Sequence, residues 1–169
     1  CVSVSGNTAL IASNTNPNGS PHQANAVYVY HFDGSQWVEE AKLIPSDEPP
    51  YDSFGDSVCI DGDIAVIGNS GDQENGWQSG AAYVFERNGS QWIEVQKLFA
   101  SDASEQDEFG ESVSVSGDVI LIGAKRAGVG AAYVFRKEKE SWNQEAKLLV
   151  NDLGSDDYFG YSVSISGTL

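Results

Sequence analysis

The most regular polar feature of the sequence is a pair of aspartates that precedes each of three Phe-Gly dipeptides. In every copy one aspartate lies seven residues before the phenylalanine and the other lies two residues before it. The three pairs are Asp47 and Asp52, Asp102 and Asp107, and Asp152 and Asp157. Short carboxylates often accept backbone N–H bonds in turns, so the first interpretation is that they hold the connections between repeats. The alternative is an oxygen-rich cation site at each connection, with calcium as the possible ion.

A second group of candidate ligand-binding residues lies in the segment 68–80, between two predicted strands. The group consists of Asp72, Glu74, Asn75 and Trp77. A tryptophan among polar side chains suits contact with a carbohydrate or a peptide, because it combines a large apolar ring with an N–H donor. The alternative is that the segment packs on its neighbour in the fold.

The side chains that commonly perform catalysis form no recognisable group. His22 and His31 lie in different contexts, and the sequence shows no Ser/His/Asp or metal-ligand spacing. We therefore predict that the protein is not an enzyme. Cys1 and Cys59 do not occupy matching positions of the repeat described below, so they are not a disulfide framework.

The charge of the chain limits its partners. The net charge is −16, from 25 acidic and 9 basic residues. Such a charge repels nucleic-acid phosphates and anionic membrane surfaces, so neither is an expected partner, and it also serves solubility in an extracellular setting. No stretch approaches the ~20 apolar residues of a membrane span, so membrane insertion is not expected.

The elements that must position these residues form a repeat with a nearly constant frame. The phenylalanines of the three Phe-Gly dipeptides, Phe54, Phe109 and Phe159, are 55 and 50 residues apart. The interval from a turn glycine to the next tyrosine varies, at 22, 21 and 16 residues in successive copies, so the length variation lies in one loop per repeat. These pairs are Gly6 and Tyr28, Gly62 and Tyr83, and Gly117 and Tyr133. The repeats of this single domain, 1–169, span 1–53, 54–108 and 109–158, and a further repeat starts at 159–169.

Each repeat has the pattern of four short strands. In the third copy, valines alternate with serines over 112–116, a β-branched run follows over 119–123, and the fourth strand, 141–148, carries charges typical of an outer edge. Asn88-Gly89 predicts a tight hairpin before the fourth strand, as does Asp33-Gly34, whereas residues 137–139 predict a looser turn. Four antiparallel strands repeated every ~50 residues predict an all-β fold, a β-propeller of four-stranded blades with three blades and one extra strand.

Phe-Gly followed by a hairpin and a Gly-Ala ending, Ile122-Gly123-Ala124, resembles the FG-GAP repeat of integrin α-subunit-type propellers. The likeness is greatest to FG-GAP-like repeats of secreted bacterial proteins, with Gly-Ala-Ala-Tyr-Val-Phe after the loop. The resemblance implies that the chain is part of a larger ring of about seven blades. The family's D-x-D-x-D-G-x-x-D calcium loop is missing, because residues 60–64 are too short to surround an ion that takes 6–8 oxygens. The Gly-Ala ending is also replaced elsewhere, by Ala12-Ser13 and Gly68-Asn69.

Variable loops on a constant frame favour a binding function. We expect an extracellular binding or adhesion module, secreted or at the cell surface, that presents its loops to a protein or a carbohydrate ligand. The alternative is a structural repeat that assembles with copies of itself, or with further blades of the same parent chain. No cofactor is predicted apart from the possible calcium at the aspartate pairs.

Overall fold

Three antiparallel sheets make up most of the computed structural model, which describes residues 1–13, 25–47, 53–151 and 157–167. Each sheet has four strands in chain order. The first contains β1 (Val2–Ser5), β2 (Thr8–Ser13), β3 (Ala26–Phe32) and β4 (Trp37–Leu43). The second contains β5 (Ser57–Asp61), β6 (Ile64–Asn69), β7 (Ala81–Asn88) and β8 (Gln91–Leu98). The third contains β9 (Phe109–Ser116), β10 (Val119–Ala124), β11 (Ala131–Glu138) and β12 (Ser141–Leu148). The predicted all-β fold with four-stranded blades is confirmed.

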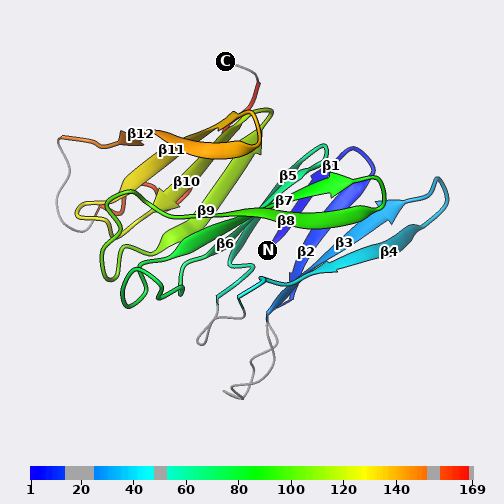
Figure 1. Ribbon diagram of the computed structural model, residues 1–169, viewed down its shortest axis with the longest axis horizontal. Helices are drawn as coiled ribbons and strands as arrows, with labels where there is room; N and C mark the ends of the chain where they lie inside the picture. Colours follow the sequence, from blue (N-terminus) through cyan, green and yellow to red (C-terminus); the bar gives the residue numbers. More distant parts are fainter. Residues whose placement is uncertain (14–24, 48–52, 152–156, 168–169) are drawn as a thin grey trace.

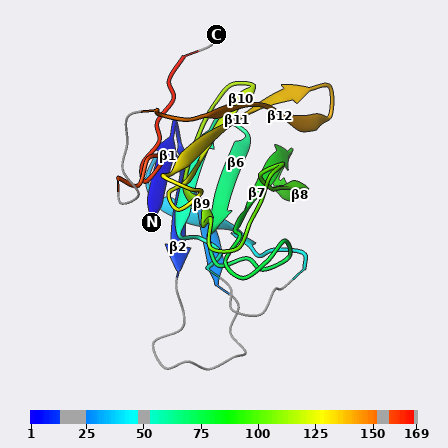
Figure 2. The same ribbon diagram turned by 90° about the vertical axis from the view of Figure 1, so that its left-hand side faces the viewer.

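The sheets follow one another like adjacent blades (Figure 1). β1 contacts β5, and β5 contacts β9, so the first strands of successive sheets are neighbours. In Figure 2, β1 and the red C-terminal segment lie on the left of the molecule and β8 lies on the right. The described residues contain no helix that is long and apolar enough to cross a membrane.

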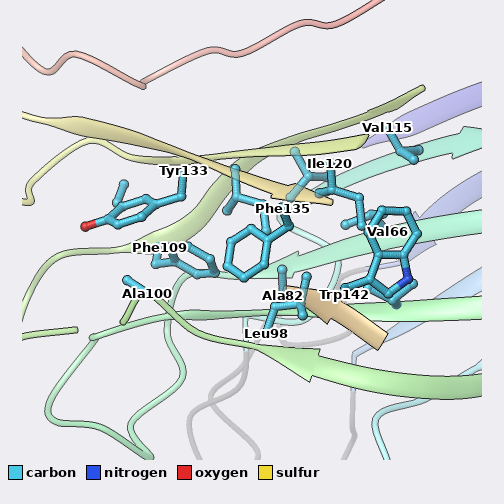
Figure 3. Packing of buried hydrophobic residues seen from close by; sticks show 14 of the residues in the cluster. Val66, Ala82, Leu98, Ala100, Phe109, Val115, Ile120, Tyr133, Phe135 and Trp142 are labelled. Carbon is cyan, nitrogen blue, oxygen red and sulfur yellow. The ribbon is translucent and has the colours of Figure 1, made fainter. Parts of the chain in front are cut away.

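The core lies between the sheets, because side chains alternate between the two faces of a strand. One cluster joins the first two sheets and includes Leu10, Val29, Ile67 and Phe85. A second cluster joins the second and third sheets, and Figure 3 shows Phe109 beside Tyr133 and Phe135 within it. The Phe109 ring meets these two rings edge to face, with centroids 5.3 and 6.0 Å away. Each blade therefore buries both faces only with the help of its neighbours.

The Phe-Gly dipeptide forms the junction between blades. Phe109 makes a parallel bridge to Gly80 of the preceding blade, as Phe159 does to Gly130. Gly110 has φ +92, and a Cβ built on it would lie 2.2 Å from the carbonyl oxygen of Ala81. Glycine is required here both for the left-handed backbone and for the close approach.

Gly68, which stands where the third repeat has the glycine of its Gly-Ala ending, lies at the same junction from the other side. A Cβ on Gly68 would lie 1.9 Å from the carbonyl oxygen of Gly110, which also accepts a 2.8 Å hydrogen bond from Ser57 Oγ. In the first sheet, Ala12 and Cys1 pair in place of this glycine and serine. A cavity of about 170 Å³ lies at that first junction, with Ala12, Cys1 and Gly55 in its lining. The first junction is therefore packed less tightly.

Side chains of each first strand also bond to the backbone of the next. The N–H of Ile60 donates to Ser3 Oγ at 3.2 Å, and the N–H of Val115 donates to Cys59 Sγ at 3.4 Å. The same bond joins the N–H of Ile165 to Ser114 Oγ at 3.1 Å. The segment around Ile165 thus lies against β9, as the next first strand would, but the described residues 161–167 form no strand, so the predicted extra strand is not seen.

The hairpin between β11 and β12 differs from the prediction. It was expected to be looser than the others, but β11 ends at Glu138 and β12 begins at Ser141, which leaves the same two-residue turn as between β7 and β8. Lys139 takes the left-handed conformation, with φ +58, where the second blade has Gly89 with φ +64. The pairing of the flanking strands prevails over the preference of the turn residue.

Candidate functional site

Asp47, the first of the paired aspartates, binds across the first blade junction. Its carboxylate accepts a 3.0 Å hydrogen bond from the hydroxyl of Tyr83 on β7 and a 2.5 Å bond from Lys97 Nζ on β8. The same ammonium contacts Asp72 at 2.8 Å and Glu74 at 2.9 Å. Burial alone would lower the pKa of Lys97, but the hydrogen bonds that its ammonium donates to the three carboxylates outweigh burial and raise it. Burial raises the pKa of Tyr83.

Asp102 makes the same contacts at the second junction. It accepts a 3.0 Å bond from the hydroxyl of Tyr133 and a 2.6 Å bond from Lys147 Nζ. The hydrogen bond from Lys147 holds the pKa of Asp102 below its usual value, and burial raises the pKa of Tyr133 to about 12. We call this group of an aspartate, a tyrosine and a lysine the junction clamp. In both clamps the cationic partner of the aspartate is a lysine.

The aspartates two residues before Phe-Gly have a different setting. Asp107 is buried, and its carboxylate accepts a 2.9 Å bond from the N–H of Ser104, which is the turn chemistry suggested by the sequence. Burial raises the pKa of Asp107. Asp157 is exposed, and Asp52 and Asp152 lie outside the described residues. No group of three or more His, Cys, Asp or Glu side chains in the described part of the chain is arranged to hold a metal ion. Calcium at the junctions stays the untested alternative, and the lysine partners of Asp47 and Asp102 argue against it.

The four candidate residues of the segment 68–80 lie in different environments. Asp72 is 1% exposed and its carboxylate is paired with Lys97, so it faces the fold and not solvent. Glu74 reaches the same lysine from the surface. Asn75 is exposed, and Trp77 is 49% exposed. The outward-facing candidates are therefore Glu74, Asn75 and Trp77, and of these Glu74 is engaged with Lys97.

Backbone hydrogen bonds fasten this loop to the start of the third blade. Three consecutive carbonyl oxygens of the loop accept hydrogen bonds from the connection after β8. The N–H of Gln106 donates to Trp77 at 2.7 Å, that of Glu108 to Gln78 at 3.0 Å, and that of Phe109 to Ser79 at 3.1 Å. The loops that follow β6, β8 and β10 lie beside one another at the lower left of Figure 1. The loop thus packs on its neighbour while it keeps a tryptophan at the surface, which combines the two alternatives left open by the sequence.

The structure adds a cavity that the sequence did not identify as a site. It has a volume of about 290 Å³ and lies between the connection after β8, the loop after β10 and Tyr158 of the connection after β12. Its lining consists of Glu105, Gln106, Lys125, Arg126, Gly128 and Tyr158. The signals in the sequence were the shortness of the third variable loop and its adjacent cations, Lys125 and Arg126. The other wall comes from a connection of regular length, which shows no distinctive pattern.

The comparisons with known proteins agree with the repeat. The family model described as FG-GAP repeat matches residues 37–85, 92–135 and 142–169. Each match begins at the tryptophan of an outer strand, and so each extends across a Phe-Gly junction. No curated protein matches the chain. Because the family model matches most of the sequence, and the sheets have the expected blade order, the chain belongs to the FG-GAP repeat family.

Proposed function

We propose that this chain is a binding module of a secreted or cell-surface protein, and that its ligand, a protein or a glycan, contacts the adjoining loops after β6, β8 and β10. The observation that carries the proposal is the setting of Trp77. Its side chain is half exposed, yet its loop is held by the buried Asp72–Lys97 pair and by the backbone bonds to Gln106 and Glu108. A rigidly held, exposed aromatic side chain can contact a ligand without a large loss of conformational entropy.

We propose no catalytic step at this surface. Lys97 is engaged by the carboxylates of Asp47, Asp72 and Glu74, which leaves it unsuited to a catalytic role. FG-GAP repeats are generally not enzymatic, which supports the prediction of a binding role.

Glycan and peptide arrays probed with the wild-type chain and with Trp77→Ala test the proposal. We expect Trp77→Ala to lose at least about tenfold in affinity for the ligands found, as is common for a central tryptophan. Trp37→Ala is the matched control, because Trp37 is 48% exposed but lies on β4, away from these loops. Equal binding by wild type and Trp77→Ala would remove Trp77 from the binding surface.

A second candidate function is assembly with other blades, which an uncovered face of the first sheet supports. Val2 and Val4 are 68% and 62% exposed, whereas Val58 and Ile60, their counterparts in the second sheet, are 6% and 5% exposed. A neighbouring blade would bury this face. A second copy could continue the array of blades by packing its β1 against β9 of the first copy. This stacking is disfavoured, because the segment around Ile165 already lies against β9 at that position. Light scattering tests this candidate, and a strictly monomeric chain would count against self-assembly.

A further inference from the structure

The cavity between the second and third blades has a lining of planar polar groups and one aromatic ring. Glu105 offers a carboxylate, Gln106 an amide and Arg126 a guanidinium, and Tyr158 offers a phenol that is 43% exposed. Carboxylate and amide oxygens accept hydrogen bonds, whereas guanidinium and amide N–H groups donate them. The lining therefore presents acceptors and donors together around one small volume.

The charges at the cavity are nearly balanced. Lys125 Nζ lies 2.7 Å from Glu111 and 3.0 Å from Glu108, so this cation is already neutralised. Arg126 is less engaged, with one contact of 3.3 Å to Glu108 and a side chain that is 48% exposed. Glu105 adds a negative charge to the same lining. An anionic ligand such as a phosphate would need an excess of cations, which this arrangement does not supply.

We propose that the cavity binds one pyranose ring of an uncharged glycan; this inference rests on the proposed binding function and names the class of its ligand. Vicinal hydroxyls of a sugar each donate and accept a hydrogen bond, which matches the forked guanidinium of Arg126 and the carboxylate of Glu105. The apolar C–H face of the ring suits the phenol of Tyr158. The volume of about 290 Å³ is at the lower end of small-molecule sites, which favours a single ring.

Two features of the backbone keep the cavity open. The interval from turn glycine to tyrosine is 16 residues in the third blade and 21 in the second, so the third blade's loop is shorter by five residues. Gln106, on the opposite wall, has φ +67 and is fixed by the 2.7 Å bond from its N–H to the carbonyl oxygen of Trp77. Left-handed backbone at a non-glycine residue is a strained conformation that is concentrated at binding sites. Gln106 also connects the cavity with the loop of Trp77.

Saturation-transfer NMR of the whole chain with the methyl glycosides of glucose, galactose, mannose and N-acetylglucosamine tests the proposal. A single ring held by these contacts should bind with a dissociation constant on the order of 1 mM. Arg126→Ala should weaken the binding of the responding glycoside at least tenfold. Arg126→Lys should also weaken it, because lysine keeps the charge and loses the fork. Arg136→Ala is the matched control, since Arg136 lies on β11 and pairs with Glu145 at 2.7 Å.

The outcomes separate this inference from the proposed function. A response that Arg126→Ala removes and Arg136→Ala retains supports the cavity as a sugar site. No response to any of the four glycosides, or a response unchanged in Arg126→Ala, overturns it. Array binding that depends on Trp77 can persist in that case, and then only the inference has failed. A peptide on the array whose binding depends on Arg126 would overturn the glycan class.

Discussion

Replacing Asp102 with alanine should destabilise the protein by about 2 kcal/mol, because it removes both contacts of a junction clamp. The hydroxyl of Tyr133 donates to this carboxylate, and Tyr133 is 0% exposed, so the loss of a partner for this group costs about 1–2 kcal/mol. The ion pair with Lys147 is partly open to solvent, with side chains 27% and 52% exposed, and adds about 0.5 kcal/mol.

Asp47→Ala should cost less, about 1 kcal/mol, although Asp47 occupies the same position of the repeat. Without Asp47, the hydroxyl of Tyr83 still has Asp72 at 3.4 Å. Lys97 still has Asp72 at 2.8 Å and Glu74 at 2.9 Å. The first clamp has a reserve carboxylate, whereas among the described residues no second carboxylate lies within hydrogen-bond distance of Tyr133 or Lys147.

Urea unfolding followed by tryptophan fluorescence measures both changes, and thermal unfolding should place Asp102→Ala about 4–8 °C below wild type. The difference between wild type and Asp102→Ala should also depend on pH. The folded pKa of Asp102 is lowered, so its contribution is complete above the unfolded value near 3.8 and is lost as the pH falls through the folded pKa.

Glu140→Ala removes one negative charge from an exposed turn residue and serves as the control for net charge. The clamp hypothesis fails if Asp102→Ala is no more destabilising than Glu140→Ala. It also fails if Tyr133→Phe and Asp102→Ala are additive, since paired residues should show a coupling of about 1 kcal/mol.

Three further outcomes follow from the junctions and turns. Gly110→Ala should lower the free energy of unfolding by about 3 kcal/mol or more, because its Cβ would lie 2.2 Å from a carbonyl oxygen. Gly34→Ala, at a glycine with φ +100 and open space around it, should lower it by only about 1 kcal/mol. Urea midpoints compare the two variants, and similar losses of stability would contradict the steric explanation. Lys139→Gly should stabilise by about 0.5–1 kcal/mol by relieving a left-handed lysine, and a lower urea midpoint would show that the turn is not strained. Millimolar calcium should leave the melting temperature unchanged, because lysines already neutralise the aspartates of both clamps; a rise of about 3 °C or more would show a cation site.

The sequence was sufficient to predict the blades because their elements repeat. Three copies in register define the strands and the varying loop, and the charges of the fourth strand indicate an outer edge. The aspartates were recognised as junction residues, but their partners were not. Tyr83 and Lys97 follow Asp47 by 36 and 50 residues, and only the stacking of two blades brings these side chains together.

The candidate site was predicted less completely, for two physical reasons. Composition cannot distinguish a buried carboxylate from an exposed one, so Asp72 and Trp77 were grouped although one faces Lys97 and the other faces solvent. A cavity depends on what surrounds it. The space beside Arg126 is bounded by residues from three connections, and no local pattern in any one of them shows that the three walls meet.

The looser first junction has a consequence for cooperativity. In a linear array each blade is stabilised chiefly by its contacts with adjacent blades, so local opening begins at the weakest contact. The second junction has Gly68 and Ser57 against the carbonyl oxygen of Gly110, whereas the first has Ala12, Cys1 and a cavity. Amide protons of β2 and β3 should therefore exchange with solvent before those of β6 and β7. The chain should lose its first blade in a separate, earlier step while the loop surface around Trp77 stays folded.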